Sequence, residues 1–410
     1  MSKKLQIALL TVSIFIIGFS VAGGMVHASS SGTSDGAYSH IQVYSEVLSH
    51  VRLDYVEEPN MPLVTDGALH GLLESLDANS SYLSPAEYKA FKQRKTQGKA
   101  GIGATISKRF GYATVVSIIP GGPADKAGVN NSDIIETLDG KNTHEMSLAE
   151  VRSRLSGEPG SRLDCTVIRA RKVEPQKITI LRDVVTLPSV QEQMMADNVG
   201  YVKAQTLSKG RAQEIAAKLK SLEKEGAKRL VLDLRNASEG DEDEGVAVAN
   251  LFLNHGLIAY LQGQKYPKAT YNADPQKKIT DLPLAVLVNR GTAGAAEIVA
   301  ASILENSRGD VVGDKTFGDG SIQKLIEVPD GSALILSVAK YYTPNGKAIQ
   351  ENGITPNVQI AMAADDQVVL ADDDDGATPS EEPQKAAPPK EDDQLRRAIE
   401  VLKNKAKKAS

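Results

Sequence analysis

Cysteine and histidine are scarce in this chain of 410 residues, and each shortage removes a class of function. A single cysteine, Cys165, cannot form a disulfide framework, and we expect it to be a small apolar residue of a strand. As a nucleophile it would need a histidine partner, and no nearby histidine suggests itself. The six histidines are scattered without the spacing of metal ligands, so we expect neither a metal site nor a cofactor.

An excess of positive charge is also missing. Lysine and arginine number 47 against 52 aspartates and glutamates, which gives a net charge of -5. A nucleic-acid-binding protein would show a basic patch or stripe, so we expect no nucleic-acid partner. Apolar residues make up 41% of the chain, enough for ordinary cores, and the length suits two or three domains.

The first residues have the pattern of an export signal. Lys3 and Lys4 precede a long apolar stretch, and the small-x-small run at 26–28 suits cleavage after Ala28. At roughly 20 residues the apolar stretch is also long enough for an uncleaved membrane anchor. We therefore predict a signal peptide or anchor at 1–28, and an exported, periplasmic or otherwise extracytoplasmic protein.

A helical region is predicted for 36–95. One helix should carry a single apolar face, because its apolar residues recur at spacings of three and four. A second helix follows Pro62, and Ser84, Pro85 and Glu87 have the pattern of a third helix start. The apolar face of the first helix would consist of Ile41, Tyr44, Val47, Leu48 and Val51.

Residues 97–183 have the sequence pattern of a PDZ domain. Short β-branched runs punctuated by glycine surround one amphipathic helix, for which Ser147 is the expected N-cap and Gly157 the end. The run GGPADKAGV followed by SDIIETLDGK resembles the PDZ domains of bacterial proteases. In that resemblance Gly101, Ile102, Gly103 and Ala104 form the loop that binds a peptide's terminal carboxylate through backbone N–H groups.

Residues 184–362 alternate between strand and helix patterns. The runs RLVLDLR and LPLAVLVN are almost continuously apolar, as expected for strands covered on both faces. We therefore predict an α/β core with a mostly parallel sheet, into which the PDZ domain is inserted. The acidic, proline-rich segment 363–390 is predicted to be a disordered linker, and 391–410 a C-terminal amphipathic helix.

Five runs of the core resemble the tail-specific (C-terminal processing) serine peptidases in order and spacing. They are VGYVKAQTLS, LVLDLRNASEG, VLVNRGTAGAAEIVAASI, VVGDKTFGDGSIQ and YYTPNGKAIQENGITPNV. The resemblance extends over residues 37–362 and the final helix. It implies a PDZ-containing peptidase that cuts chains near their carboxyl ends, with a serine nucleophile and a lysine base.

The positions that carry this chemistry are substituted. Transferred by motif, the nucleophile position is Gly294, the base position is Asp319, and Glu239 replaces a glycine of the oxyanion loop. Gln323, which in the family orients the lysine, is retained, and a second serine position holds Ala296. Because glycine has no side-chain atom that can attack a carbonyl, we predict a catalytically inactive relative, a pseudoprotease.

Three functions remain open at this stage. The first is a scaffold, adaptor or regulatory subunit that binds protein C-termini, alone, as a homo-oligomer, or in a mixed oligomer with an active relative. The second is an active peptidase with a relocated nucleophile, for which Thr292 and Ser321 are the candidates; Lys315, near the base position, is not the family's base. The third is a structural envelope protein that recognises no peptide.

Overall fold

The computed structural model describes residues 35–97, 100–109, 111–169, 174–360 and 392–409. The predicted signal or anchor at 1–28 and the predicted linker at 363–390 lie outside these residues. The chain divides into two compact units, residues 1–68 and residues 69–410. Among the described residues, no helix is both long enough and apolar enough to cross a bilayer.

The first unit contains α2 (Asp35–Asp54) and the start of α3 (Met61–Glu74). Both predicted helices are present. The apolar face expected on α2 is not covered within this unit, since Ile41, Tyr44 and Val47 are 61%, 44% and 54% exposed.

The second unit begins with the end of α3 and continues through β1 (Ser81–Leu83) and α4 (Pro85–Gln97). The predicted helix start is confirmed, because the Ser84 amide donates to Glu87 Oε2 at 2.8 Å and the Glu87 amide donates to Ser84 Oγ at 3.5 Å. β1 is a strand that the sequence did not predict.

The PDZ segment folds as an antiparallel sheet with order β2-β3-β4-β6-β7, and β5 pairs with β4. Its helix α6 begins after the expected N-cap Ser147, whose hydroxyl accepts from the Glu150 amide, and its C-cap is Ser156. Cys165 is a buried strand residue, 3% exposed, as predicted. β2 is an edge strand, the kind of strand to which a peptide adds in PDZ domains. The elements are β2 (Ala104–Arg109), β3 (Tyr112–Ile118), α5 (Pro123–Lys126), β4 (Ile134–Leu138), β5 (Lys141–Asn142), α6 (Leu148–Leu155), β6 (Arg162–Ile168) and β7 (Gln176–Leu181).

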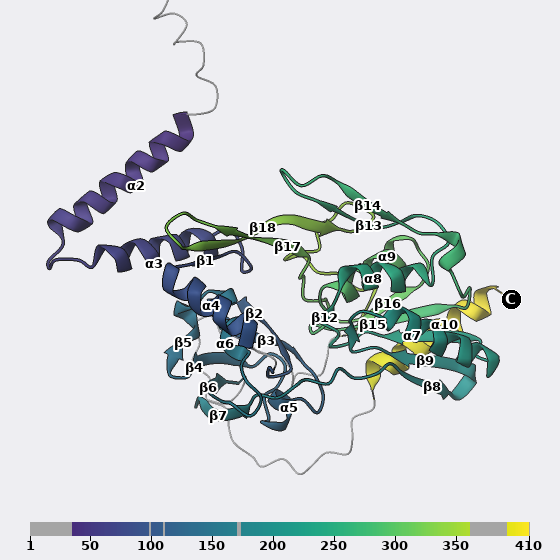
Figure 1. Cartoon of the computed structure of the whole chain (residues 1–410). Coiled ribbons are helices and arrows are strands. Elements are labelled where there is room, and N and C mark those ends of the chain that lie inside the picture. Colours follow the sequence, from purple (N-terminus) through teal and green to yellow (C-terminus); the bar gives the residue numbers. More distant parts are fainter. Residues whose placement is uncertain (1–34, 98–99, 110, 170–173, 361–391, 410) are drawn as a thin grey trace, which may run out of the picture. The chain divides into compact units, whose positions relative to one another are not determined.

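The core's central sheet has the order β19-β16-β15-β11-β9-β8 (Figure 1). Every neighbouring pair is parallel except β8 with β9. Its strands are β8 (Gln191–Met195), β9 (Val199–Lys203), β11 (Arg229–Asp233), β15 (Leu284–Val288), β16 (Asp310–Gly313) and β19 (Val358–Gln359).

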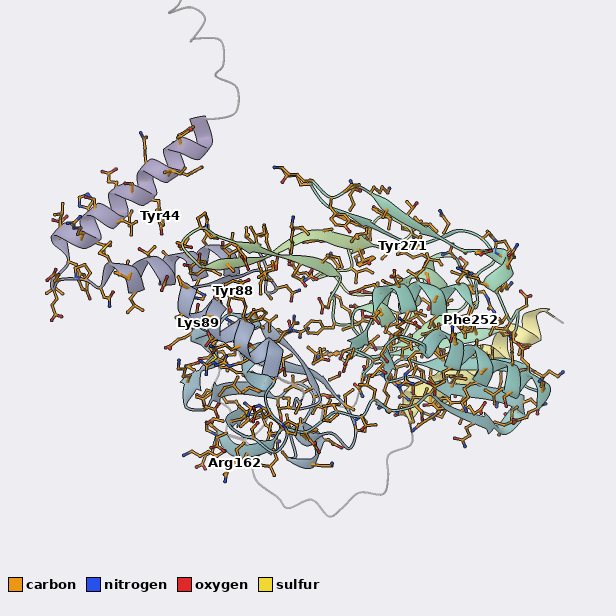
Figure 2. The ribbon with its side chains drawn as sticks, viewed as in Figure 1. Tyr44, Tyr88, Lys89, Arg162, Phe252 and Tyr271 are labelled. Carbon is orange, nitrogen blue, oxygen red and sulfur yellow. The ribbon has the colours of Figure 1, made fainter. Side chains whose placement is uncertain are left out.

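Helices cover both faces of this sheet, which explains the continuously apolar strands. Leu230 and Val286 face the larger core together with α7 (Arg211–Lys224), α8 (Glu242–Asn250) and α9 (Ala295–Glu305). Phe252 lies in this core and is labelled in Figure 2. The neighbouring residues Val231 and Leu287 face the opposite side, where α10 (Asp393–Ala409) packs with Ala398 and Leu402.

A second, antiparallel sheet corrects the expected fold class. β1, β18, β13 and β14 follow one another in it, and β17 pairs with β18. A mostly parallel sheet therefore describes the central sheet but not this second one. The second sheet was not predicted: β13 with β14 and β17 with β18 are neighbours in sequence, but the pairs of β18 with β1 and β13 join strands far apart. The remaining strands are β13 (Leu257–Gln262), β14 (Ala269–Asn272), β17 (Ser321–Glu327), β18 (Ala333–Tyr342) and the short parallel pair β10 (Thr206–Leu207) and β12 (Glu239–Gly240); short 3-10 helices span Thr143–Glu145, Ala196–Asn198 and Pro275–Lys277.

Candidate active site

Gly294 lies at a sharp turn between β15 and the first turn of α9. Its backbone angles are φ 61° and ψ -123°, in a region that disfavours every residue with a Cβ. A strained strand-to-helix turn of this kind is the device that projects a nucleophilic serine in other hydrolases. A Cβ built on Gly294 would meet only the backbone oxygen of Asp319, at 3.9 Å. The structure therefore brings the predicted nucleophile and base positions together, around open space.

Glu297 holds these two positions in place. It is fully buried at the third position of α9. Its Oε2 accepts from the Gly294 amide at 3.0 Å and from the Asp319 amide at 2.8 Å. Its Oε1 accepts from the Gly318 amide at 2.8 Å and from the Thr316 hydroxyl. Burial raises the pKa of Glu297 to about 8, although the hydrogen bonds from Thr316, Asp319 and Gly318 act in the opposite direction.

Asp319 is half-buried at the start of β17 and receives one long hydrogen bond, from Asn79 Nδ2 to its Oδ1 at 3.3 Å. Asn79 also donates to Ser321 Oγ at 3.1 Å. Gln323 donates to Ser321 Oγ at 2.8 Å and to its carbonyl oxygen at 3.1 Å. Both amide side chains are thus turned to Ser321, and in the described residues Gln323 makes no hydrogen bond to Asp319.

The hydroxyl of Thr292, a candidate for a relocated nucleophile, is engaged in hydrogen bonds inside the core. Thr292 is fully buried, and its hydroxyl donates to the Leu234 carbonyl at 2.8 Å while accepting from the Asn289 amide at 3.0 Å. This hydroxyl therefore joins two strand ends. The Lys315 residue is exposed.

Glu239 lies at the cleft on the short strand β12. Glu239 pairs with Thr206 and Gly240 with Leu207 in a parallel ladder. The next residue, Asp241, donates its amide to the Leu207 carbonyl at 3.0 Å, which fixes the backbone on both sides. Partial burial raises the pKa of Glu239 above its ordinary value. A carboxylate therefore lies at the position that the motif comparison predicts to belong to the oxyanion loop.

Hydrogen bonds to the carbonyl oxygens of Ile102 and Gly103 hold the loop that is predicted to bind a terminal carboxylate. The Gly103 carbonyl accepts from the Ile119 amide at 2.8 Å, and the Ile102 carbonyl accepts from the Ala124 amide at 2.7 Å. Gly103 has a φ of +70°, which favours glycine. Across the described part of the chain, the amides of Ile102 and Gly103 have no backbone acceptor. These two donors remain available for an anion.

Three residues that support the site were missed from the sequence. Glu297 had a local signal, since a glutamate three residues after a helix N-cap commonly bonds back to the cap. Asn79 had none, because 240 residues separate it from Asp319. Arg152 on α6 was also missed; its guanidinium donates to the Ile106 carbonyl of β2 from Nε at 3.3 Å and from Nη2 at 3.1 Å.

This geometry defines a class of protein: a PDZ-containing peptidase fold with a strained strand-to-helix turn at its cleft. Comparisons with known proteins agree. Residues 198–360 match Peptidase family S41, and residues 114–169 match a PDZ domain. The chain belongs to this peptidase family, whose relatives are named carboxy-terminal processing proteases.

Three relatives illustrate the similarity. The carboxy-terminal processing protease CtpA of Bacillus subtilis is 33% identical over 85% of this chain and 73% of its own length. The carboxyl-terminal-processing protease of a Picosynechococcus species is 35% identical over 71% of each chain. Among solved structures, the photosystem II D1 C-terminal processing protease has 29% identity and a TM-score of 0.65, with 78% of this chain and 86% of that chain covered.

Proposed function

We propose that this protein is a non-catalytic member of its family that binds protein C-termini through its PDZ domain, as a scaffold, adaptor or regulatory subunit. The observation that carries the proposal is Gly294. It occupies the turn from which a serine would project, and it offers no atom that can attack a carbonyl. Loss of the nucleophile alone costs about a millionfold in rate in subtilisin.

The base position argues in the same direction. Asp319 has no hydroxyl to deprotonate beside Gly294, and its negative charge opposes the anionic intermediate of acyl transfer. Glu239 adds a second negative charge at the loop that would stabilise that intermediate. The cleft's electrostatics therefore disfavour amide hydrolysis independently of the missing nucleophile.

Tail binding is supported by features that are retained. The amides of Ile102 and Gly103 are unpaired among the described residues, and β2 is the edge strand of its sheet, with Arg152 on the carbonyl of Ile106. A peptide can add to that edge as a strand while its terminal carboxylate accepts from the two amides. This mode requires a free carboxyl end, which separates it from a purely structural role.

Fluorescence anisotropy with labelled C-terminal peptides tests the proposal. Peptides with a free carboxylate should bind, and the same peptides with an amidated end should not. Gly103→Val should abolish binding, because it puts a β-branched residue at φ +70° in the loop. Gly160→Ala is the matched control, since Gly160 has a φ of +79° on an exposed turn with no atom near its Cβ position. Equal affinity for amidated and free ends would refute tail recognition.

The second candidate is an active peptidase with a relocated nucleophile. Ser321 is the observation that favours it, because its hydroxyl is two residues from Asp319 and accepts from two amide side chains. Thr292 is disfavoured by its burial and by its bond to Leu234. Casein cleavage that is lost in Ser321→Ala or Thr292→Ala would support this candidate over the first.

Export and assembly are further parts of the proposal. The basic and apolar pattern of residues 1–28 supports an exported, extracytoplasmic protein, with that segment as a signal or anchor. Pairing with an active relative would let this inactive subunit deliver bound C-termini to the active site of its partner. Self-association would bring several tail-binding domains together. Size-exclusion chromatography with light scattering, alone and with an active relative, tests the assembly.

A further inference from the structure

The groove of the PDZ domain has an acidic outer wall. A cavity of about 560 Å³ is lined on one side by the carboxylate loop, by β2 and by Arg152 of α6. Its other side is formed by the peptidase core, where Glu239 and Asp319 both face the cavity. A tail bound along β2 would therefore lie beside two carboxylates.

Contacts between the PDZ domain and the core hold this wall in position. The hydroxyls of Ser117 and Ser238 are hydrogen-bonded, one residue before Glu239. Asn131 Nδ2 donates to Asn236 Oδ1 at 3.1 Å on the same loop. The loop that carries Glu239 is thus fixed against the PDZ domain. Asp319 is fixed by the hydrogen bond that its backbone amide donates to the Glu297 carboxylate.

The two carboxylates are incompletely paired. In the described residues Glu239 has no side-chain hydrogen bond or ion pair, and Asp319 has only the long bond from Asn79. The negative charge of this region also affects Glu242. Burial is the main cause that raises the pKa of Glu242, and the charges of Asp319 and other nearby acids add to it. Unpaired acids that face a cavity favour a positively charged ligand group.

Among the described residues that line the cavity, Arg152 carries the positive charge, and its guanidinium already donates hydrogen bonds. Its Nε and Nη2 donate to the same carbonyl, that of Ile106 on β2. One guanidinium also faces two carboxylates, so the lining keeps an excess of negative charge. A second cation is needed to balance it.

We infer that this groove selects C-terminal tails that carry a lysine or arginine side chain upstream of the terminal carboxylate. The inference rests on the proposed tail-binding function. A strand added to β2 presents alternate side chains to opposite sides, so one set faces the wall of Glu239 and Asp319. The basic side chain meets these acids while the tail's carboxylate stays with the amides of Ile102 and Gly103.

Three peptides that differ at one position test this selection. They share a tail and carry lysine, norleucine or glutamate at an upstream position, which is moved along the tail in separate series. In at least one series the lysine peptide should bind about fivefold more tightly than the norleucine peptide, as expected for a partly exposed ion pair. The glutamate peptide should bind most weakly, and high salt should reduce the lysine preference.

Variants of the protein test whether Glu239 and Asp319 cause the preference for lysine. The double change Glu239→Gln with Asp319→Asn keeps size and should bring the lysine-to-norleucine ratio to about one, while the norleucine peptide still binds. Glu158→Gln, at an exposed glutamate outside the cavity, should leave the ratio unchanged. Circular dichroism melting checks that each variant is folded.

The outcomes are distinguishable. Free-carboxylate tails that bind equally well with lysine and norleucine in every series would overturn the inference and leave the proposed function standing. A lysine preference that persists in the double variant would overturn the assignment to Glu239 and Asp319. Failure of every free-carboxylate tail to bind would remove the proposed function and the inference together.

Discussion

The backbone amides of Gly294 and Asp319 donate to the same carboxylate oxygen, Oε2 of Glu297, at 3.0 and 2.8 Å. One buried side chain thus joins the turn where a nucleophile would stand to the loop where its base would stand. The predicted nucleophile and base positions are therefore held together by one buried carboxylate, whatever side chains they carry.

Loss of this shared acceptor should destabilise the core. In Glu297→Gln the amide group can accept at only one atom, so at least one buried N–H group loses its partner. We expect a loss of at least about 2 kcal/mol in the free energy of unfolding, measured by urea denaturation. Glu223→Gln on α7, where the glutamate is half-exposed, should change it by less than about 0.5 kcal/mol. Equal effects would contradict the role assigned to Glu297.

A side chain at 294 should cost stability through the backbone. Gly294→Ala has open space for its Cβ, but φ is +61°, so the cost is strain of about 1–3 kcal/mol. The opposite sign is expected for Gly71→Ala on α3, where no atom lies near the added Cβ and alanine favours the helix. Thermal melting of the two variants compares them directly. A stabilised Gly294→Ala would mean that the turn is not as described.

The pair of His70 and Glu87 should make stability depend on pH in acid. Burial would raise the pKa of Glu87, but the hydrogen bonds from His70 and Ser84 outweigh it and hold that pKa at about 2. Because the folded pKa lies below the unfolded value, the carboxylate stabilises the fold above about pH 4.5 and loses this effect as pH falls toward 2. The stability difference between wild type and Glu87→Gln should therefore shrink over that range.

His70 gives the matching change at higher pH. Its hydrogen bond to Glu87 raises the pKa of His70, so its contribution is complete below the unfolded pKa of about 6.5 and is lost as pH rises through the folded value. His70→Gln should therefore cost more at pH 6 than at pH 9. A difference that grows with pH would contradict the pairing.

The C-terminal helix should be an integral part of the core. Leu402 is fully buried on α10, against the face of the central sheet that includes Val231 and Leu287. Leu402→Ala should cost about 2–5 kcal/mol in the free energy of unfolding. Arg397→Ala, at a half-exposed arginine side chain of the same helix, should cost less than about 1 kcal/mol. Similar small effects would mean that α10 does not pack on the sheet.

Local patterns in the sequence predicted much of the fold. The capping residues Ser84 and Ser147, the buried strands β11 and β15, and the helix α9 all follow from spacing and residue type. The antiparallel sheet did not, because β18 joins the neighbouring strand β17 to the distant strands β1 and β13, and no local pattern encodes these two distant pairings. Burial of α2's apolar face was expected from periodicity alone, which cannot specify a covering element.

The candidate site also was predicted only in part from the sequence. Motif order identified Gly294 and Asp319, and the structure brings them together. The supporting contacts depend on tertiary structure: Asn79 reaches Ser321 across 242 residues, and Gln323 turns to Ser321. The acidic wall of the PDZ groove could not be predicted, because it requires the core loop of Glu239 to lie against the PDZ domain.

Whether the chain has a nucleophile can be decided by intact-protein mass spectrometry after exposure to an acylating serine-protease reagent. We expect the wild-type mass to stay unchanged, and a folded Gly294→Ser, Asp319→Lys variant to gain a single adduct at residue 294. A stoichiometric acyl adduct on the wild-type chain, at any residue, would contradict the claim that this peptidase relative has no nucleophile.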